Sequence, residues 1–214
     1  VITVIDGDGK SLSDPHVVLY CGQLVETKNP ASGVAGFDVA IGQTCLAAVS
    51  KEGYLPVQRE LSSASEETVI LHQASSANSG TVVIQTLDKK GNSVAGVDVA
   101  LFLGAKPLGI SLNTQLDGTA KFEFLPLENV TFKASNEAYE GEVRVDVKPV
   151  SEIGIDGQRI SIQLSSAQAQ LAIIIVDHFG RQAIQNAVVN LVDTDGKTIS
   201  CTTNSTGQCP ATIG

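Results

Sequence analysis

The sequence predicts an all-β protein made of tandem seven-stranded Greek-key β-sandwiches, of which the third is incomplete. Three observations indicate this fold class. Apolar and polar residues alternate over short segments, a strand ending in an Asp-x-x-Gly turn recurs three times, and convincing helical periodicity over ten residues is absent. Aromatic residues make up 4% of the chain, and Trp and Met are absent, so small aliphatic and β-branched side chains must fill the interior.

The recurring turn defines the domain organisation. The turns run from Asp6 to Gly9, from Asp88 to Gly91 and from Asp177 to Gly180, so the aspartates recur at intervals of 82 and 89 residues. In each case an apolar strand precedes the turn, and a polar stretch followed by a second apolar strand comes after it. We therefore expect three β-sandwich repeats, at residues 1–76, 79–166 and 167–214.

The stretches "IDGDGK" (5–10) and "VDTDGK" (192–197) have the Asp-x-Asp-Gly pattern of a calcium loop. The other repeats replace Asp8 with Lys90 and Phe179, which are not calcium ligands. A helix–loop–helix calcium site also needs a bidentate Glu at its twelfth position, where this chain has Val17 and Asn204. We interpret these stretches as turns in which Asp caps the turn and Gly takes a positive φ, with a weak calcium site as the alternative.

The second repeat shows the strand pattern most clearly. In the segment "NVTFKAS" (129–135), Val130, Phe132 and Ala134 lie on one side of the expected strand. Thr131, Lys133 and Ser135 lie on the other side, which suits one buried and one solvated face in an antiparallel sandwich. In chain order, the seven expected strands are 81–87, 97–103, 108–113, 120–125, 129–135, 142–147 and 159–165.

These residues resemble a known family. The order of a strand, an Asp-x-x-Gly turn, "VAGVDVALF" (94–102), an Asp-Gly turn and "FEFLPL" (122–127) is similar to the carboxypeptidase-regulatory-like, or transthyretin-like, β-sandwich family. Residues 80–166 carry the resemblance most fully, and "AAVSKEGYLP" (47–56) supplies the Gly-Tyr ending in the first repeat. The resemblance implies an accessory, adhesive or structural module, and it carries no catalytic residues to this chain.

The third repeat has only 48 residues, which suffice for about half a sandwich. Its expected strands are 171–176, 187–192, 198–203 and 209–214. A half sandwich leaves its inner face and its strand edges open. Either the sequence stops within a longer chain, or a strand from a neighbouring molecule completes the sandwich, as in donor-strand assembly.

The four cysteines divide evenly between the first and third repeats. Cys21 and Cys45 fall in the first repeat, while Cys201 and Cys209 flank a short hairpin in the third. We expect disulfides Cys21–Cys45 and Cys201–Cys209, one of three possible connectivities, with reduced buried thiols as the alternative. A zinc site is disfavoured, because neither Cys-x-x-Cys nor closely spaced His partners occur.

Paired cysteines favour an extracellular or cell-surface location. Two Asn-x-Ser/Thr sequons, at Asn129 and Asn204, agree with it and are candidate glycosylation sites. Asn204 is the preferred acceptor, because it lies at an expected hairpin tip whereas Asn129 begins a strand. The chain starts at Val1 without an initiator Met or a signal peptide, so we expect a processed product or a fragment.

The residues do not predict a catalytic or cofactor site. His16, His72 and His178 occupy different positions in their repeats, as surface residues do. Tyr54 and Tyr139 suit partly buried aromatic plugs better than sugar-stacking platforms. We therefore expect no enzyme, no cofactor and no bound metal.

The net charge and the length of the apolar runs limit the classes of partner that the chain could bind. A net charge of −9 disfavours nucleic acid, and no apolar run approaches the 18 residues of a membrane span. We expect a structural or adhesive surface protein that associates with itself or with other surface proteins through sheet edges or donor strands. The alternatives are a glycan- or protein-binding module and an accessory, non-catalytic region of a secreted hydrolase.

Overall fold

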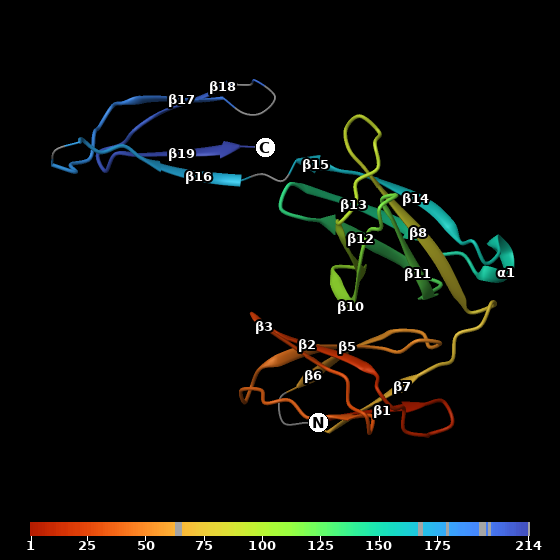
Figure 1. The fold of residues 1–214 in the computed structure, drawn as a ribbon. Coiled ribbons are helices and arrows are strands. Elements are labelled where there is room, and N and C mark those ends of the chain that lie inside the picture. Colours follow the sequence, from red (N-terminus) through yellow and green to blue (C-terminus); the bar gives the residue numbers. More distant parts are fainter. Residues whose placement is uncertain (63–65, 167–168, 179, 193–195, 197, 214) are drawn as a thin grey trace. The chain divides into compact units, whose positions relative to one another are not determined.

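The computed structural model describes residues 1–214 except 63–65, 167–168, 179, 193–195, 197 and 214, and at 169–172 and 210–213 it describes the backbone alone. The chain forms two compact units, Val1–Ser165 and Ser166–Gly214. The regular secondary structure of both units is almost entirely β-strand (Figure 1), so the all-β fold class is confirmed. The repeat boundaries after residues 76 and 166 stay a prediction.

The first unit begins with a sandwich of two sheets. Within its described residues, one sheet has three strands in the order β4-β1-β7 and the other has four in the order β3-β2-β5-β6. The strands are β1 (Ile2–Asp6), β2 (His16–Cys21), β3 (Leu24–Lys28), β4 (Val34–Ala35), β5 (Thr44–Ser50), β6 (Val57–Ser62) and β7 (Glu67–Leu71).

A second sandwich completes this unit. Its sheets have the orders β11-β8-β14 and β10-β9-β12-β13-β15 in the part of the chain that the structure describes. The short strand β15 makes this eight strands rather than the expected seven, and a single helical turn, α1 (Val150–Ile153), precedes β14. The strands are β8 (Ser79–Leu87), β9 (Asp98–Leu103), β10 (Lys106–Asn113), β11 (Thr119–Pro126), β12 (Asn129–Ser135), β13 (Tyr139–Asp146), β14 (Gln158–Gln163) and β15 (Ser165–Ser166).

Two details differ from the expected antiparallel sandwich. The first and last long strands of each sandwich lie side by side in one sheet and run in the same direction. β1 therefore pairs in parallel with β7, and β8 with β14. Thr131, expected on the wet face of β12, is only 6% exposed. Its strand is central in its sheet, and the cross-strand partners of Thr131, Arg144 on β13 and Phe102 on β9, have larger side chains that flank it on the same face.

Each sandwich of the first unit has its own apolar core. The first core contains Ile2, Val4, Leu19, Val49 and Leu71, among others. In the second core, the rings of Phe122 and Phe132 lie 4.9 Å apart between centroids. Burying such side chains stabilises each sandwich by roughly 1.5–3 kcal/mol per residue relative to leaving it exposed.

The two sandwiches of the first unit also touch through β10. The side chain of Gln58 donates to the carbonyl oxygens of Lys106 and Pro107 at 2.8 and 2.7 Å, and Lys106 forms an ion pair with Glu60. A Cβ atom added to Gly109 would lie 2.9 Å from Cγ2 of Val18. This close approach buries Val18, which is 4% exposed and lies outside the apolar core of its own sandwich.

The second unit contains four short strands, β16 (Ala169–Ile174), β17 (Val188–Val192), β18 (Thr198–Thr202) and β19 (Gln208–Ile213). Within its described residues they form two antiparallel pairs, β16 with β19 and β17 with β18. All four strands overlap the expected ones. The turn expected at 192–197 lies largely outside the described residues, as does Phe179.

Candidate functional site

The Asp-x-x-Gly stretches are turns capped by aspartate. Oδ1 of Asp6 accepts hydrogen bonds from the amides of Asp8 and Lys10, at 3.0 and 2.9 Å. Asp88 caps its own turn in the same way, through the amides two and four residues further on. Both turns have the expected positive φ at glycine, +81° at Gly9 and +84° at Gly91.

The third turn departs from this expectation. Here the positive φ is at Arg181 rather than at Gly180. The reason is an extra residue, because the amide of Asp177 bonds to the carbonyl oxygen of Gln182, five positions on, whereas the amide of Asp6 bonds to Lys10, four positions on. The left-handed position therefore shifts along the longer turn.

A common backbone arrangement recurs near the start of each of the three expected repeats. The amides of Val4, Thr86 and Ile175 donate to the carbonyl oxygens of Gly33, Gly118 and Gly207, at 2.8, 2.9 and 2.8 Å. The carbonyl oxygens of the same three residues accept from the amides of Leu12, Val94 and Ile184. Val4 lies in β1, Thr86 lies in β8 and Ile175 directly follows β16, so the same two hydrogen bonds recur at or directly after these three strands.

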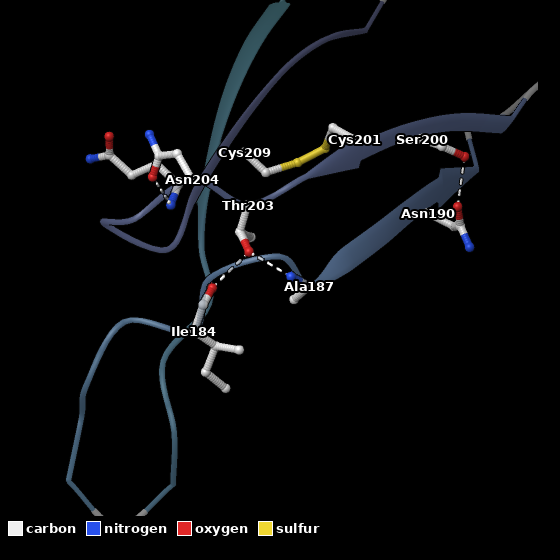
Figure 2. The surroundings of a disulfide bond; sticks show 9 residues. Ile184, Ala187, Asn190, Ser200, Cys201, Thr203, Asn204 and Cys209 are labelled. Atoms are coloured by element: carbon white, nitrogen blue, oxygen red, sulfur yellow. Dashed lines mark hydrogen bonds between the residues drawn. A yellow bond between two sulfur atoms is a disulfide. The ribbon is translucent and has the colours of Figure 1, made fainter.

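Two buried threonines fix the residue-by-residue correspondence between the second and third repeats. Oγ1 of Thr114 accepts from the amide of Val97 at 3.0 Å, and Oγ1 of Thr203 accepts from the amide of Ala187 at 2.8 Å. Each hydroxyl also donates to a carbonyl oxygen, that of Val94 or of Ile184, as Figure 2 shows for Thr203. Ala187 therefore corresponds to Val97, and β17 to β9. These threonines could not be identified from the sequence, because an isolated Thr before a polar turn gives no periodic pattern.

This correspondence reveals open strand edges in the second unit. In the second sandwich, β8 pairs with both β11 and β14, and β9 pairs with both β10 and β12. In the described residues of the second unit, β16 pairs with β19 alone and β17 with β18 alone. An unpaired edge presents backbone N–H and C=O groups to any strand that can align with it.

The inner face behind these edges is also incompletely covered. Val99 and Leu101 of β9 are fully buried, at 0% exposure. Their counterparts on β17, Val189 and Leu191, are only partly buried. On the opposite face of β17, Val188 and Val192 are 68% and 67% exposed. The second unit thus combines free edges with uncovered apolar side chains, which is the candidate functional site.

Both disulfides form in the pairing expected from the sequence. Cys21 and Cys45 lie near the facing ends of the paired strands β2 and β5, with Cα atoms 4.5 Å apart, and both side chains are buried in the first core. Cys201 on β18 and Cys209 on β19 have Cα atoms 5.9 Å apart (Figure 2). This second bond joins the two strand pairs of the second unit.

The other candidate residues occupy separate elements. Nδ1 of His16, at the start of β2, lies 2.9 Å from Oδ1 of Asn29, while His72 follows β7 and His178 lies in the turn after Asp177. Tyr54 and Tyr139 are partly buried and pack against the first and second cores, respectively.

Throughout the described residues, His, Cys, Asp and Glu form no group of three or more suited to a metal ion. No helix among the described residues has the length and apolar character needed to cross a membrane.

A groove in the first unit lies beside a strained residue. Phe124 has a φ of +58°, which is an outlier for a bulky side chain, and it lies where the register of β11 against β8 shifts. The groove, of about 510 Å³, is lined by Phe124, Thr81, Lys121 and Ile155 together with part of the connection 74–79. Its lining contains both polar and apolar side chains.

No protein-family model matches the chain, and no curated protein sequence matches it, so the transthyretin-like resemblance stays a prediction. Among solved structures, the Bacillus anthracis TIE protein is similar over 99% of this chain and 42% of its own, with 16% identity and a TM-score of 0.35. A streptococcal ancillary pilin is similar over 78% of this chain and 62% of its own, with 16% identity and a TM-score of 0.33. The minor pilin of Streptococcus agalactiae is similar over 77% of this chain and 94% of its own, with 11% identity and a TM-score of 0.33. This chain therefore spans less than two thirds of the first two proteins, and identities and TM-scores this low assign neither a family nor a function.

Proposed function

We propose that this chain is a non-catalytic structural or adhesive protein of the cell surface or extracellular space, which associates with other copies through the open strand edges of its second unit. The proposal rests on one observation. In the described residues β16 and β17 each have one strand partner, whereas their counterparts β8 and β9 each have two. A strand from a neighbouring copy would take the position that β12 or β14 takes in the second sandwich.

The covalent and packing features of the first unit suit a stiff spacer. Its two sandwiches are held together by β10 against β2, β5 and β6, and the first is stapled by the buried Cys21–Cys45 bond. Disulfides persist in oxidising compartments, which supports an extracytoplasmic location.

The test is the concentration dependence of the molar mass in analytical ultracentrifugation. We expect the protein to associate as its concentration rises, and we expect the double substitution Val188→Lys and Val192→Lys to abolish this. Charged side chains on an edge strand block pairing, and both valines are already exposed, so the fold should survive the change.

Ile41→Lys with Leu116→Lys is the matched control. Ile41 and Leu116 are 96% and 98% exposed and lie in turns, so the same two positive charges are added away from any strand edge. This variant should associate like the parent protein. A parent protein that stays monomeric at every concentration would refute the proposal, and so would equal loss of association in the control.

The groove beside Phe124 favours a second candidate, a glycan- or protein-binding module. Strained residues held by their surroundings cluster at functional sites. A soluble oligosaccharide that binds there should raise the melting temperature of the intact protein, and Phe124→Ala should remove that rise. If no member of an oligosaccharide panel shifts the melting temperature, glycan binding at this groove is excluded.

A further inference from the structure

The hairpin that joins β18 to β19 presents one of the two sequons in a fixed geometry. Oδ1 of Asn204 accepts hydrogen bonds from the Thr206 amide at 3.0 Å, from the Thr206 hydroxyl at 2.7 Å and from the Gln208 amide at 3.0 Å. Both Asn204 and Thr206 are exposed. The hydrogen bonds found in the described part of the chain engage Oδ1 and not Nδ2. Because the amide group is planar, this holds Nδ2 on the side away from the turn.

The Cys201–Cys209 disulfide closes the same hairpin. It spans eight residues and brackets the sequon, and its Cys209 end is fully buried (Figure 2). Thr203, next to Asn204, is 2% exposed and is hydrogen-bonded to Ile184 and Ala187. The base of the loop is therefore anchored while its tip projects into solvent.

The sequon at Asn129 lies in a different setting. Asn129 begins β12 and is exposed, but the hydroxyl-bearing residue of this sequon, Thr131, is 6% exposed. Thr131 pairs with Arg144 of β13 on one side and with Phe102 of β9 on the other. An enzyme that acts on the folded chain and must recognise both residues of the sequon cannot reach Thr131 without removing β12 from the sheet.

We infer that Asn204 is an acceptor for an N-linked glycan and that Asn129 is not. In the transfer, Nδ2 of Asn204 forms a bond to the anomeric carbon of an oligosaccharide carried on a lipid diphosphate. The bond between that carbon and the diphosphate oxygen breaks, the lipid diphosphate leaves with the electron pair, and Nδ2 gives up one proton. The glycan would project from the end of the second unit, apart from the edge of β17, and its presence does not depend on the proposed self-association.

The test is secretion of the full chain from a eukaryotic host, followed by intact-mass measurement and by enzymatic deglycosylation that converts a glycosylated Asn to Asp. We expect one glycan, mapped to Asn204, and its complete loss in Asn204→Asp. The Asp variant should keep the turn, because Asp6 and Asp88 cap their turns through the same i+2 and i+4 amides. Asn129→Asp should leave the glycan unchanged.

A gain of modification provides the matched control. Oδ1 of Asp117 accepts from the Thr119 amide at 3.0 Å and from the Thr119 hydroxyl at 2.7 Å, as Oδ1 of Asn204 does from Thr206. Asp117→Asn therefore creates a sequon that shares these two hydrogen bonds, with its Thr119 partly buried at the start of β11. We expect this variant to carry a second glycan. A secreted chain without a glycan at Asn204, or with one at Asn129, would overturn the inference, and so would an Asp117→Asn chain that gains nothing.

Discussion

At the scale of single residues, aspartates stabilise the turns between strands. The hydrogen bond from the Asn92 side chain, with those from the Asn92 and Lys90 amides, lowers the pKa of Asp88 below its usual value. The hydrogen bonds from the Thr119 hydroxyl and amide lower the pKa of Asp117 in the same way. These carboxylates are thus bonded more favourably in the folded chain than in the unfolded one.

A pH dependence of stability follows from Asp88. Because its pKa is lower in the folded state, its contribution is fully present above the unfolded-state pKa and is lost as the pH falls through the folded-state pKa, below about pH 4. We expect Asp88→Asn to flatten the decline of the unfolding free energy below pH 4, measured by urea titration. Asp156→Asn, at an exposed carboxylate outside these turns, is the control, and an unchanged slope in Asp88→Asn would contradict this account.

In each repeat, the carbonyl oxygen of one glycine accepts a hydrogen bond from a residue in the first strand or directly after it. In the second repeat this glycine, Gly118, is more tightly constrained than an ordinary turn glycine. Gly118 has a φ of +78°, and a Cβ atom there would lie 2.9 Å from Cβ of Ser93 and 3.1 Å from the Thr86 carbonyl oxygen. Gly96 has a φ of +70° with nothing within 4 Å of an added Cβ. The two positions share the backbone conformation and differ in the space available.

We therefore expect different costs for alanine at these two glycines. Gly96→Ala should lower the unfolding free energy by about 1–2 kcal/mol, the cost of a left-handed conformation for an L-residue. Gly118→Ala should lower it further, because the added methyl group also meets Ser93 and the backbone of Thr86. Chemical denaturation measures both, and equal costs would show that the close approach at Gly118 is unimportant.

At the scale of secondary-structure elements, the two disulfides differ in what they join. Cys21–Cys45 links two paired strands inside one sheet and spans 24 residues, whereas Cys201–Cys209 spans 8. A disulfide restricts the unfolded chain more when the loop that it closes is longer. The first bond should therefore contribute more to stability, although the second unit has the smaller core to support it.

Replacing each pair of cysteines by alanine tests this difference. We expect Cys21→Ala with Cys45→Ala to lower the unfolding free energy of the first unit by about 3 kcal/mol. The loss for Cys201→Ala with Cys209→Ala in the second unit should be smaller. Thermal unfolding of the intact chain, with hydrogen exchange to assign each transition to its unit, measures both. A larger loss from the second pair would show that the length of the closed loop does not determine how much each disulfide contributes to stability.

The strands themselves could be predicted well from local pattern. The segment "NVTFKAS" matches β12 at both ends, because its alternation and its flanking turns are local properties of the chain. The burial of Thr131 and the parallel pairing of β1 with β7 could not be predicted, since both depend on which distant strands become neighbours. The strained backbone at Phe124 likewise has no local signal.

At the scale of the whole molecule, the candidate site follows from comparing one repeat with another. The short third repeat could be predicted from its 48 residues, but its uncovered residues Val189 and Leu191 needed the correspondence set by Thr114 and Thr203. Those threonines act through long-range hydrogen bonds, which sequence periodicity does not report. The inference from open edges to assembly therefore rests on the structure more than on the sequence.

The chain's net charge of −9 opposes association between copies, whereas β17 and β18 carry no charged residue. Salt screens exposed charges over about 8 Å at physiological ionic strength, so association through these strands should strengthen as salt is added. Electrostatic attraction between copies would show the opposite dependence. Stronger association at higher salt would place the driving force in strand pairing and apolar contact.

Negative-stain electron microscopy of the intact protein, at moderate concentration and physiological salt, tests the central claim most directly. The account predicts regular filaments or sheets in the parent protein and dispersed particles in the variant with Lys at positions 188 and 192. Discrete, unassociated particles of the parent protein under the same conditions would contradict it.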